Sequence, residues 1–166
     1  QGRFLSANLV HSMDGFILRE LGRRCTYDEL RIQAIKQLLR KSPGNQKPSQ
    51  MVDIFRDLYK KSGYLSARIL DYIDSTNVSM VDELPIWELI NSLPSRPFPI
   101  ISIHDCFRIH PNYGNDLRKQ YNLQLSLIAE SKILEFLLSQ MLGQKVPVYK
   151  LEKFSKDILD SNYALS

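Results

Sequence analysis

Residues 98–110 read Phe98-Pro-Ile-Ile-Ser-Ile-His-Asp-Cys-Phe-Arg-Ile-His110. Two apolar, β-prone runs, 100–103 and 106–109, flank His104 and Asp105, and this pattern predicts a buried strand–turn–strand. A buried carboxylate needs an ionic partner or a cation, so a bend that presents Asp105 is well suited to a divalent metal. Asp is also frequent in ordinary turns. From these residues alone, the ordinary hairpin turn is the stronger interpretation.

Length and composition predict one globular domain, or one domain with an excursion. The chain has 166 residues, of which 43% are hydrophobic, and a net charge of +4. It does not begin with Met, which indicates a processed product, a fragment or a piece of a longer polypeptide. The first residues do not resemble a signal peptide, and no run is long enough to span a bilayer. Cys25 and Cys106 lack metal-ligand spacing, which favours a reduced, intracellular setting.

Positive charge is concentrated early in the chain. The cluster comprises Arg19, Arg23, Arg24, Arg31, Lys36, Arg40 and Lys41. Such a cluster is a plausible footprint for phosphates, although a solvated basic helix face is the commoner explanation.

Helical patterns dominate the rest of the chain. The capping-box pattern Thr26-Tyr-Asp-Glu29 predicts a helix with Leu30, Ala34, Ile35, Leu38 and Leu39 on its apolar face. Further helices are expected over 49–62, 65–75, 86–93, 116–142 (with an interruption near Ser131) and 153–159. The segment His11-Ser-Met-Asp-Gly15 predicts either a turn at Asp14–Gly15 or a helix over 16–22. In the second case His11 lies at a strand-to-helix junction.

The three histidines do not form a recognisable metal motif by themselves. His11, His104 and His110 lack the close pairing that a zinc site requires. The sequence also contains no Ser-His-Asp elbow, phosphate-binding glycine loop or dinucleotide fingerprint.

Three blocks, in order, resemble the single-subunit RNA polymerases of bacteriophages and mitochondria. Residues 8–19, Asn-Leu-Val-His-Ser-Met-Asp-Gly-Phe-Ile-Leu-Arg, resemble the family's palm segment N-x-V-H-S-x-D-G-x-x-L-R. Residues 103–107, Ile-His-Asp-Cys-Phe, are similar to its metal-binding motif C, usually I-H-D-S-F. Residues 156–166, Lys-Asp-Ile-Leu-Asp-Ser-Asn-Tyr-Ala-Leu-Ser, are similar to the family's extreme C-terminus.

The chain also departs from the family pattern. Cys106 replaces the usual Ser, and Leu165-Ser166 replaces the usual aromatic-alanine end. A segment of some seventy residues separates the first two blocks, where the family has a short helix and turn. The resemblance therefore implies an α+β fold: a polymerase palm fragment (1–22 and 96–166) with a motif C hairpin packed by helices, and a mainly helical insertion (23–95). This insertion points to a divergent phage enzyme.

The resemblance also implies roles for individual residues. Asp105 would be the catalytic metal ligand in a two-Mg²⁺ centre for nucleotidyl transfer. Contacts to the RNA–DNA hybrid or nucleotide would come from His11, Ser12, Arg19 and His104. Tyr163 and Ser166 would support the active site from the C-terminus. The second carboxylate and the fingers helix have no counterpart here, so the remainder of the polymerase must supply them.

The implied partners are that remainder, a DNA template, the RNA product and ribonucleoside triphosphates, with no membrane. The implied location is the host cytoplasm or a virion. Two alternatives stay open. A DNA polymerase palm also uses a His-Asp motif, although it usually has a second acidic residue where Cys106 stands. A non-catalytic nucleic-acid-binding or structural subunit is also compatible with the sequence.

Overall fold

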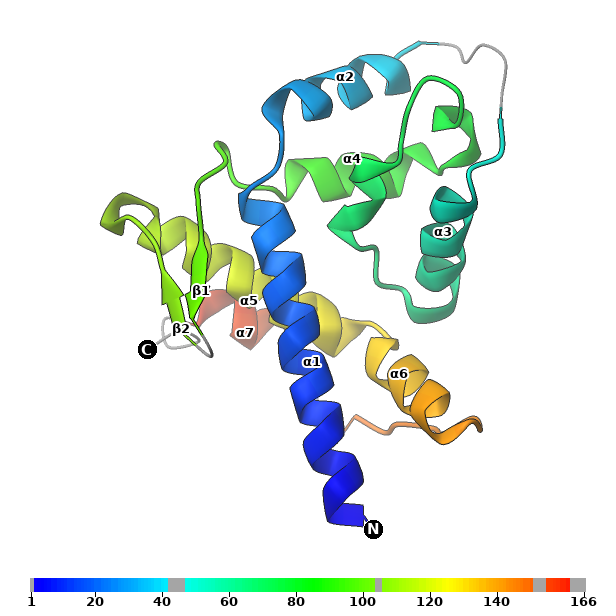
Figure 1. Ribbon diagram of the computed structural model, residues 1–166, viewed down its shortest axis with the longest axis vertical. Coiled ribbons are helices and arrows are strands. Elements are labelled where there is room, and N and C mark those ends of the chain that lie inside the picture. Colours follow the sequence, from blue (N-terminus) through cyan, green and yellow to red (C-terminus); the bar gives the residue numbers. More distant parts are fainter. Residues whose placement is uncertain (1, 42–46, 104–105, 151–154, 162–166) are drawn as a thin grey trace.

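The computed structural model describes residues 2–41, 47–103, 106–150 and 155–161, with only the backbone of 2–6 and 103 described. The described chain is mostly helical, with one small antiparallel sheet (Figure 1). The elements are α1 (Gly2–Cys25), α2 (Glu29–Leu39), α3 (Gln50–Ser62), the 3₁₀ helices η1 (Ala67–Asp71) and η2 (Val78–Met80), α4 (Glu83–Asn91), β1 (Ile101–Ile103), β2 (Cys106–Arg108), η3 (Pro111–Tyr113), α5 (Gly114–Glu130), α6 (Ile133–Leu142) and α7 (Ser155–Asp160). This confirms an α+β description in its loosest sense.

Helix α1 is one unbroken helix of 24 residues. The predicted turn at Asp14–Gly15, and the predicted junction at His11, are therefore wrong. No proline interrupts residues 2–25, and the two interior glycines, Gly15 and Gly22, cost only about 1 kcal/mol each. Packing of the C-terminal half, through Ile17 and Leu21, outweighs that cost. His11 consequently lies in the middle of a helix.

Helix α2 begins two residues later than the capping box predicts. Asp28 is its N-cap and accepts hydrogen bonds from the backbone N–H groups of Leu30 and Arg31. Thr26 instead bonds the carbonyl of Gly22 at the end of α1. The predicted apolar face was wrong in part, since Leu30 is 81% exposed. The buried side chains of α2 are those of Ile32, Ile35 and Leu39.

The ends of the other helices largely follow sequence signals. Ser49 caps α3, and Gly63 ends it with a left-handed φ of 72°. The long helix predicted over 116–142 is broken at Ser131, as expected, giving α5 and α6. The helix predicted over 65–75 is instead the short η1, and the side chain of Asn77 donates to the carbonyl of Tyr72, the residue after η1.

Two apolar clusters hold these elements together. The larger cluster lies within the segment 32–90 and joins α2, α3, η1 and α4. The smaller one joins the end of α1 to α5 and the approach to the hairpin, through Leu21, Cys25, Phe98 and Leu117. The proposed boundaries at 22–23 and 95–96 stay a prediction. Buried hydrogen bonds, described below, cross both of them.

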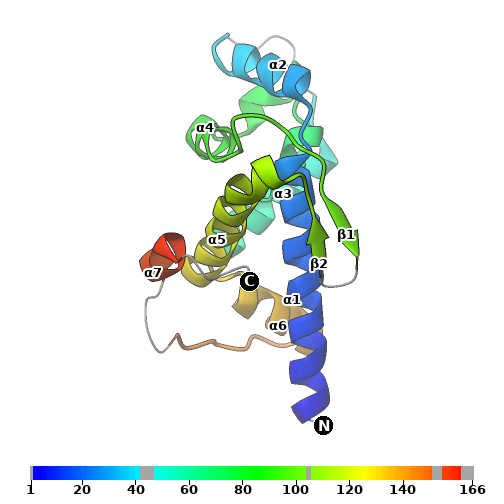
Figure 2. The ribbon, with the colours of Figure 1, turned by 90° about the vertical axis from the view of Figure 1, so that its left-hand side faces the viewer.

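Strands β1 and β2 form a hairpin with Ile103 paired to Cys106. The prediction that its strands are buried is wrong for the described side chains: Ile101 is 59% exposed, and Cys106 and Arg108 are also exposed. Phe107 is half-buried and packs toward the cluster shared by α1 and α5, so the hairpin is covered on this face. Figure 2 shows the hairpin running beside α1.

Among the described residues, no helix combines the length and apolar composition needed to cross a membrane.

Candidate functional site

The predicted site residues divide into two groups. His104, Asp105, Tyr163 and Ser166 lie outside the described residues, so their roles stay predictions. His11, Ser12 and Arg19 are all on α1, and all three are exposed. The described elements that flank these positions are α1, β2, α5 and α7.

The N-terminal half of α1 projects from the body of the molecule (Figure 1). His11 and Ser12 lie on this half, as does Val10, which is 57% exposed. His11, Gly15 and Arg19 follow one another at four-residue spacing, so they share one side of the helix. A projecting helix with exposed His and Ser side chains is chemically able to contact an extended polar partner.

Gly15 makes room for the side chain of Arg19. A Cβ atom added at Gly15 would lie 3.2 Å from Arg19 Nη1. The glycine within the His-Ser-x-Asp-Gly block therefore allows the guanidinium to lie flat against the helix.

Replacing Gly15 with alanine is expected to raise the free energy of unfolding by roughly 0.5–1 kcal/mol, because alanine favours helix, and to displace the Arg19 guanidinium. Urea denaturation of the chain measures the first effect. Gly22→Ala in the same helix is the matched control, since nothing lies within 4 Å of a Cβ there. If Gly15→Ala were destabilising while Gly22→Ala was not, the Arg19 contact would be shown to be rigid rather than adjustable.

A cavity of about 180 Å³ connects α1, β2 and α5. It is lined by Asp14, Ile17, Leu18, Phe107 and Tyr121. Burial raises the pKa of the Tyr121 phenol, and the nearby Asp14 carboxylate adds to this effect. Asp14 was not among the predicted site residues, although it belongs to the first sequence block. Its carboxylate is an oxygen donor beside the hairpin.

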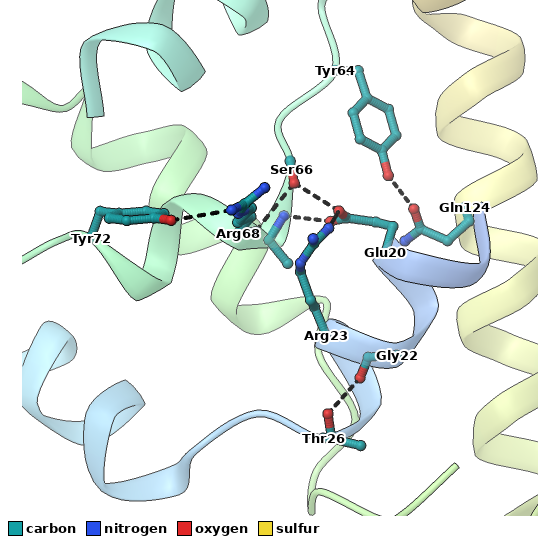
Figure 3. A network of polar contacts seen from close by, with 10 residues as sticks. Glu20, Gly22, Arg23, Thr26, Tyr64, Ser66, Arg68, Tyr72 and Gln124 are labelled. Carbon is teal, nitrogen blue, oxygen red and sulfur yellow. Dashed lines mark hydrogen bonds and ion pairs between the residues drawn. The ribbon is translucent and has the colours of Figure 1, made fainter. Parts of the chain in front are cut away.

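A buried carboxylate ties α1 to the segment that follows α3. Glu20 is fully buried and accepts hydrogen bonds from the Ser66 hydroxyl (2.7 Å) and the Ala67 backbone N–H (Figure 3). Arg23 approaches the same carboxylate at 3.7 Å. Ser66 and Ala67 come from the predicted insertion, so their bonds to Glu20 fix its position relative to α1.

Arg24, one turn further along, ties α1 to α4 and α5. Its guanidinium is fully buried and donates to Gln120 Oε1 (2.8 Å) and to the Ser92 hydroxyl (2.5 Å) and carbonyl (3.0 Å). Gln120 Nε2 donates to the same Ser92 carbonyl at 2.8 Å. Burial lowers the pKa of Arg24, whereas Tyr64 and Glu20 act to raise it.

A third buried contact lies beside these two. The Tyr64 hydroxyl donates to Gln124 Oε1 on α5 (Figure 3). Burial, reinforced by Glu20, raises the pKa of Tyr64. Phe16 of α1 meets the Tyr64 ring edge-on at 5.1 Å. The three contacts together make α1 a common support for the insertion and α5.

Several residues of the basic cluster that the sequence suggested as a phosphate-binding surface are instead engaged in contacts within the chain. Arg24 is inaccessible, and Arg31 donates to the carbonyls of Leu70, Asp71 and Ile73. Arg40 lies over the Trp87 ring at 5.6 Å. As a phosphate-binding group, Arg24 is therefore excluded, and Arg31 is mainly a brace between α2 and η1.

The third sequence block begins in α7, which packs against α5. Asn122, buried in α5, donates from Nδ2 to the Ser161 carbonyl at 2.7 Å. The third block is thus held against α5 at Ser161. The last residues, including Tyr163 and Ser166, are outside the described part.

Magnesium takes oxygen ligands, and the donor available beside the hairpin in the described residues is the Asp14 carboxylate. That donor suits Mg²⁺ in kind. In the described part of the chain, His, Cys, Asp and Glu side chains do not gather in groups of three or more that could hold a metal.

No protein-family model matches the chain, and no curated protein matches it either.

Proposed function

We propose that this chain is the C-terminal palm portion of a single-subunit DNA-directed RNA polymerase with a helical insertion. The observation that best supports the proposal is spatial. Three blocks, at 8–19, 103–107 and 156–166, resemble that family, and each has described residues beside α5.

Each block reaches α5 through a separate contact. Asp14 and Leu18 of the first block share a cavity with Phe107 of the second and Tyr121 of α5. The third block begins in α7, which packs on α5, and Ser161 accepts a hydrogen bond from Asn122. A chance resemblance in three distant segments would give no reason for them to meet on one helix. Their meeting is what a single active-site framework requires.

The insertion does not separate the first two blocks. Residues 26–95 leave α1 at its C-terminal end and return to the hairpin there: the Phe98 N–H donates to the Cys25 carbonyl at 2.7 Å. The two ends of the insertion are thus adjacent, which is the arrangement expected when a segment is added to an existing helix–hairpin connection.

In this proposal Asp105 is the metal ligand that this chain contributes. Bound Mg²⁺ would stabilise charge on the attacking and leaving oxygens of nucleotide addition. The exposed side of α1, with His11 and Ser12, would contact the hybrid by its shape rather than by its sequence. Arg19 and His104 would contribute further nucleotide or hybrid contacts, and Tyr163 and Ser166 would support the site.

The test is the choice of nucleotide by the complete polymerase on a primed DNA template. We expect Mg²⁺-dependent extension with ribonucleotides and much weaker extension with deoxynucleotides under the same conditions. Preference for deoxynucleotides would replace the proposal with a DNA polymerase. Template binding without extension of either kind would leave a non-catalytic nucleic-acid-binding subunit as the function.

A further inference from the structure

We propose that a lysine-lined pocket where α3 meets the α5–α6 junction binds the phosphate backbone of a nucleic acid. The pocket has a volume of about 360 Å³. Its cationic side chains are Lys60 and Lys61, from the end of α3, and Lys132, from the break between α5 and α6. The remaining lining residues are Ser62, Gly63, Leu127, Glu130 and Ser131.

The lysines are brought together by the backbone. The Lys132 N–H donates to the Ser62 carbonyl at 2.6 Å, which joins the end of α3 to the start of α6. Gly63, with its positive φ, ends α3 at this point, and the extended conformation of Ser131 ends α5. The ends of two helices that are far apart in sequence therefore border one pocket, and lysine lies beside each of these ends.

The charge of this hollow is largely uncompensated. Within the described part of the chain, ion pairs join Arg23 to Glu20 and Arg56 to Asp53, and none involves Lys60, Lys61 or Lys132. All three lysines are exposed, and Glu130 is the one acidic side chain among the lining residues. Lys150 adds a fourth cation nearby, held by the carbonyls of Ala129 and Ser131 rather than by a carboxylate.

These features favour phosphate contact over base recognition. Lysine is a compact, flexible point charge that suits phosphates without fixing their orientation. No aromatic ring lines the pocket among the described residues, so a stacking platform for bases is absent from it. The expected contact is therefore independent of sequence and strongly dependent on salt. The choice of a nucleic acid over other polyanions rests on the proposed function.

The test measures binding of a fluorescent oligonucleotide, single-stranded and duplex, to the full chain by anisotropy between about 50 and about 200 mM salt. Neither Mg²⁺ nor nucleotides are added, so the result does not depend on catalysis. The variant Lys60→Gln/Lys61→Gln/Lys132→Gln removes the pocket's charge. The control Lys47→Gln/Lys119→Gln/Lys145→Gln removes the same charge from exposed positions outside the pocket.

Each lost phosphate contact lowers the slope of log affinity against log salt by about 0.7–0.9. For the pocket variant, we expect the magnitude of that slope to decrease by about 2 or more. We also expect this variant to bind at least about tenfold more weakly at the lowest salt. We expect the control to keep most of both. An equal loss in the two variants would reduce the effect to net charge and overturn the proposal, as would an unchanged slope in the pocket variant. If the complete polymerase failed to extend a primer while the unaltered chain kept its slope of log affinity against log salt, only the polymerase proposal would be contradicted.

Discussion

Asp105→Asn is expected to abolish nucleotide addition by the complete polymerase while template affinity stays unchanged. Asparagine keeps the size of the side chain and removes the negative charge that a Mg²⁺ ligand needs. The metal contributes several kcal/mol of transition-state stabilisation, and each 1.36 kcal/mol is a factor of ten in rate. The rate of extension should therefore fall about a thousandfold or more, as measured by single-turnover primer extension.

Asp82→Asn is the matched control for this experiment. It makes the same chemical change at an exposed residue outside the three sequence blocks, where the side chain makes no cap hydrogen bond. Its expected effect on the rate is much smaller. Near-normal extension by Asp105→Asn would remove Asp105 from the catalytic centre, and equal losses in both variants would assign the effect to net charge rather than to one ligand.

The two cysteines report whether such variants are folded. Cys106 is exposed on β2, whereas Cys25 is buried, and burial raises its pKa to about 12. A folded chain should therefore react with a thiol reagent quickly at one site and slowly at the other, because the thiolate is the reactive form. Asp105→Asn should keep this difference.

Arg24→Leu is expected to lower the free energy of unfolding by roughly 3 kcal/mol or more. Hydrogen bonds to charged groups contribute about 1.5–3 kcal/mol each, and Arg24 donates to both Gln120 and Ser92. Leucine would also leave Gln120 Oε1 buried without its donor. Urea denaturation of the full chain measures the loss. Cys25, the next residue, should become more reactive as the end of α1 loosens.

Two further variants separate the causes. Arg24→Leu/Gln120→Leu removes both partners, and it should recover part of the loss because an apolar pair leaves fewer unsatisfied groups. Arg40→Leu removes an exposed arginine whose contact with Trp87 contributes about 0.5–1 kcal/mol. If Arg24→Leu were no more destabilising than Arg40→Leu, the buried network would not hold α1 in place.

Local signals in the sequence predicted the ends of elements well. Ser49 and Gly63 bound α3 as expected, the break at Ser131 is where the pattern weakens, and the hairpin strands fall within the predicted runs. Each of these outcomes depends on a few neighbouring residues, and capping and left-handed glycine are local effects. They can therefore be inferred without tertiary information.

The buried charges could not be predicted in the same way. Glu20 and Arg24 lie in a polar, basic stretch that is typical of a solvated helix face, and their partners, Ser66, Ser92 and Gln120, are far away in sequence. Only the tertiary arrangement shows that Arg24 is internal, and that Lys60, Lys61 and Lys132 from two distant segments meet at one pocket. Asp14 was overlooked for a related reason: its proximity to Phe107 is a tertiary fact.

Because α1 is continuous, the position of its C-terminal end determines the direction of side chains in its N-terminal half. An α-helix turns about 100° and rises about 1.5 Å per residue, so His11 stands about 20 Å along the axis from Arg24. Because hydrogen bonds of Glu20 and Arg24 hold one end of this helix in place, they also determine the direction in which the His11 side chain leaves the helix axis. One residue inserted between His11 and Glu20 would rotate His11 by about 100° about the helix axis. Four inserted residues would bring it close to its original direction and move it about 6 Å further along the axis. Through its contacts with Glu20 and Arg24, the insertion therefore influences the direction of His11 at the other end of α1.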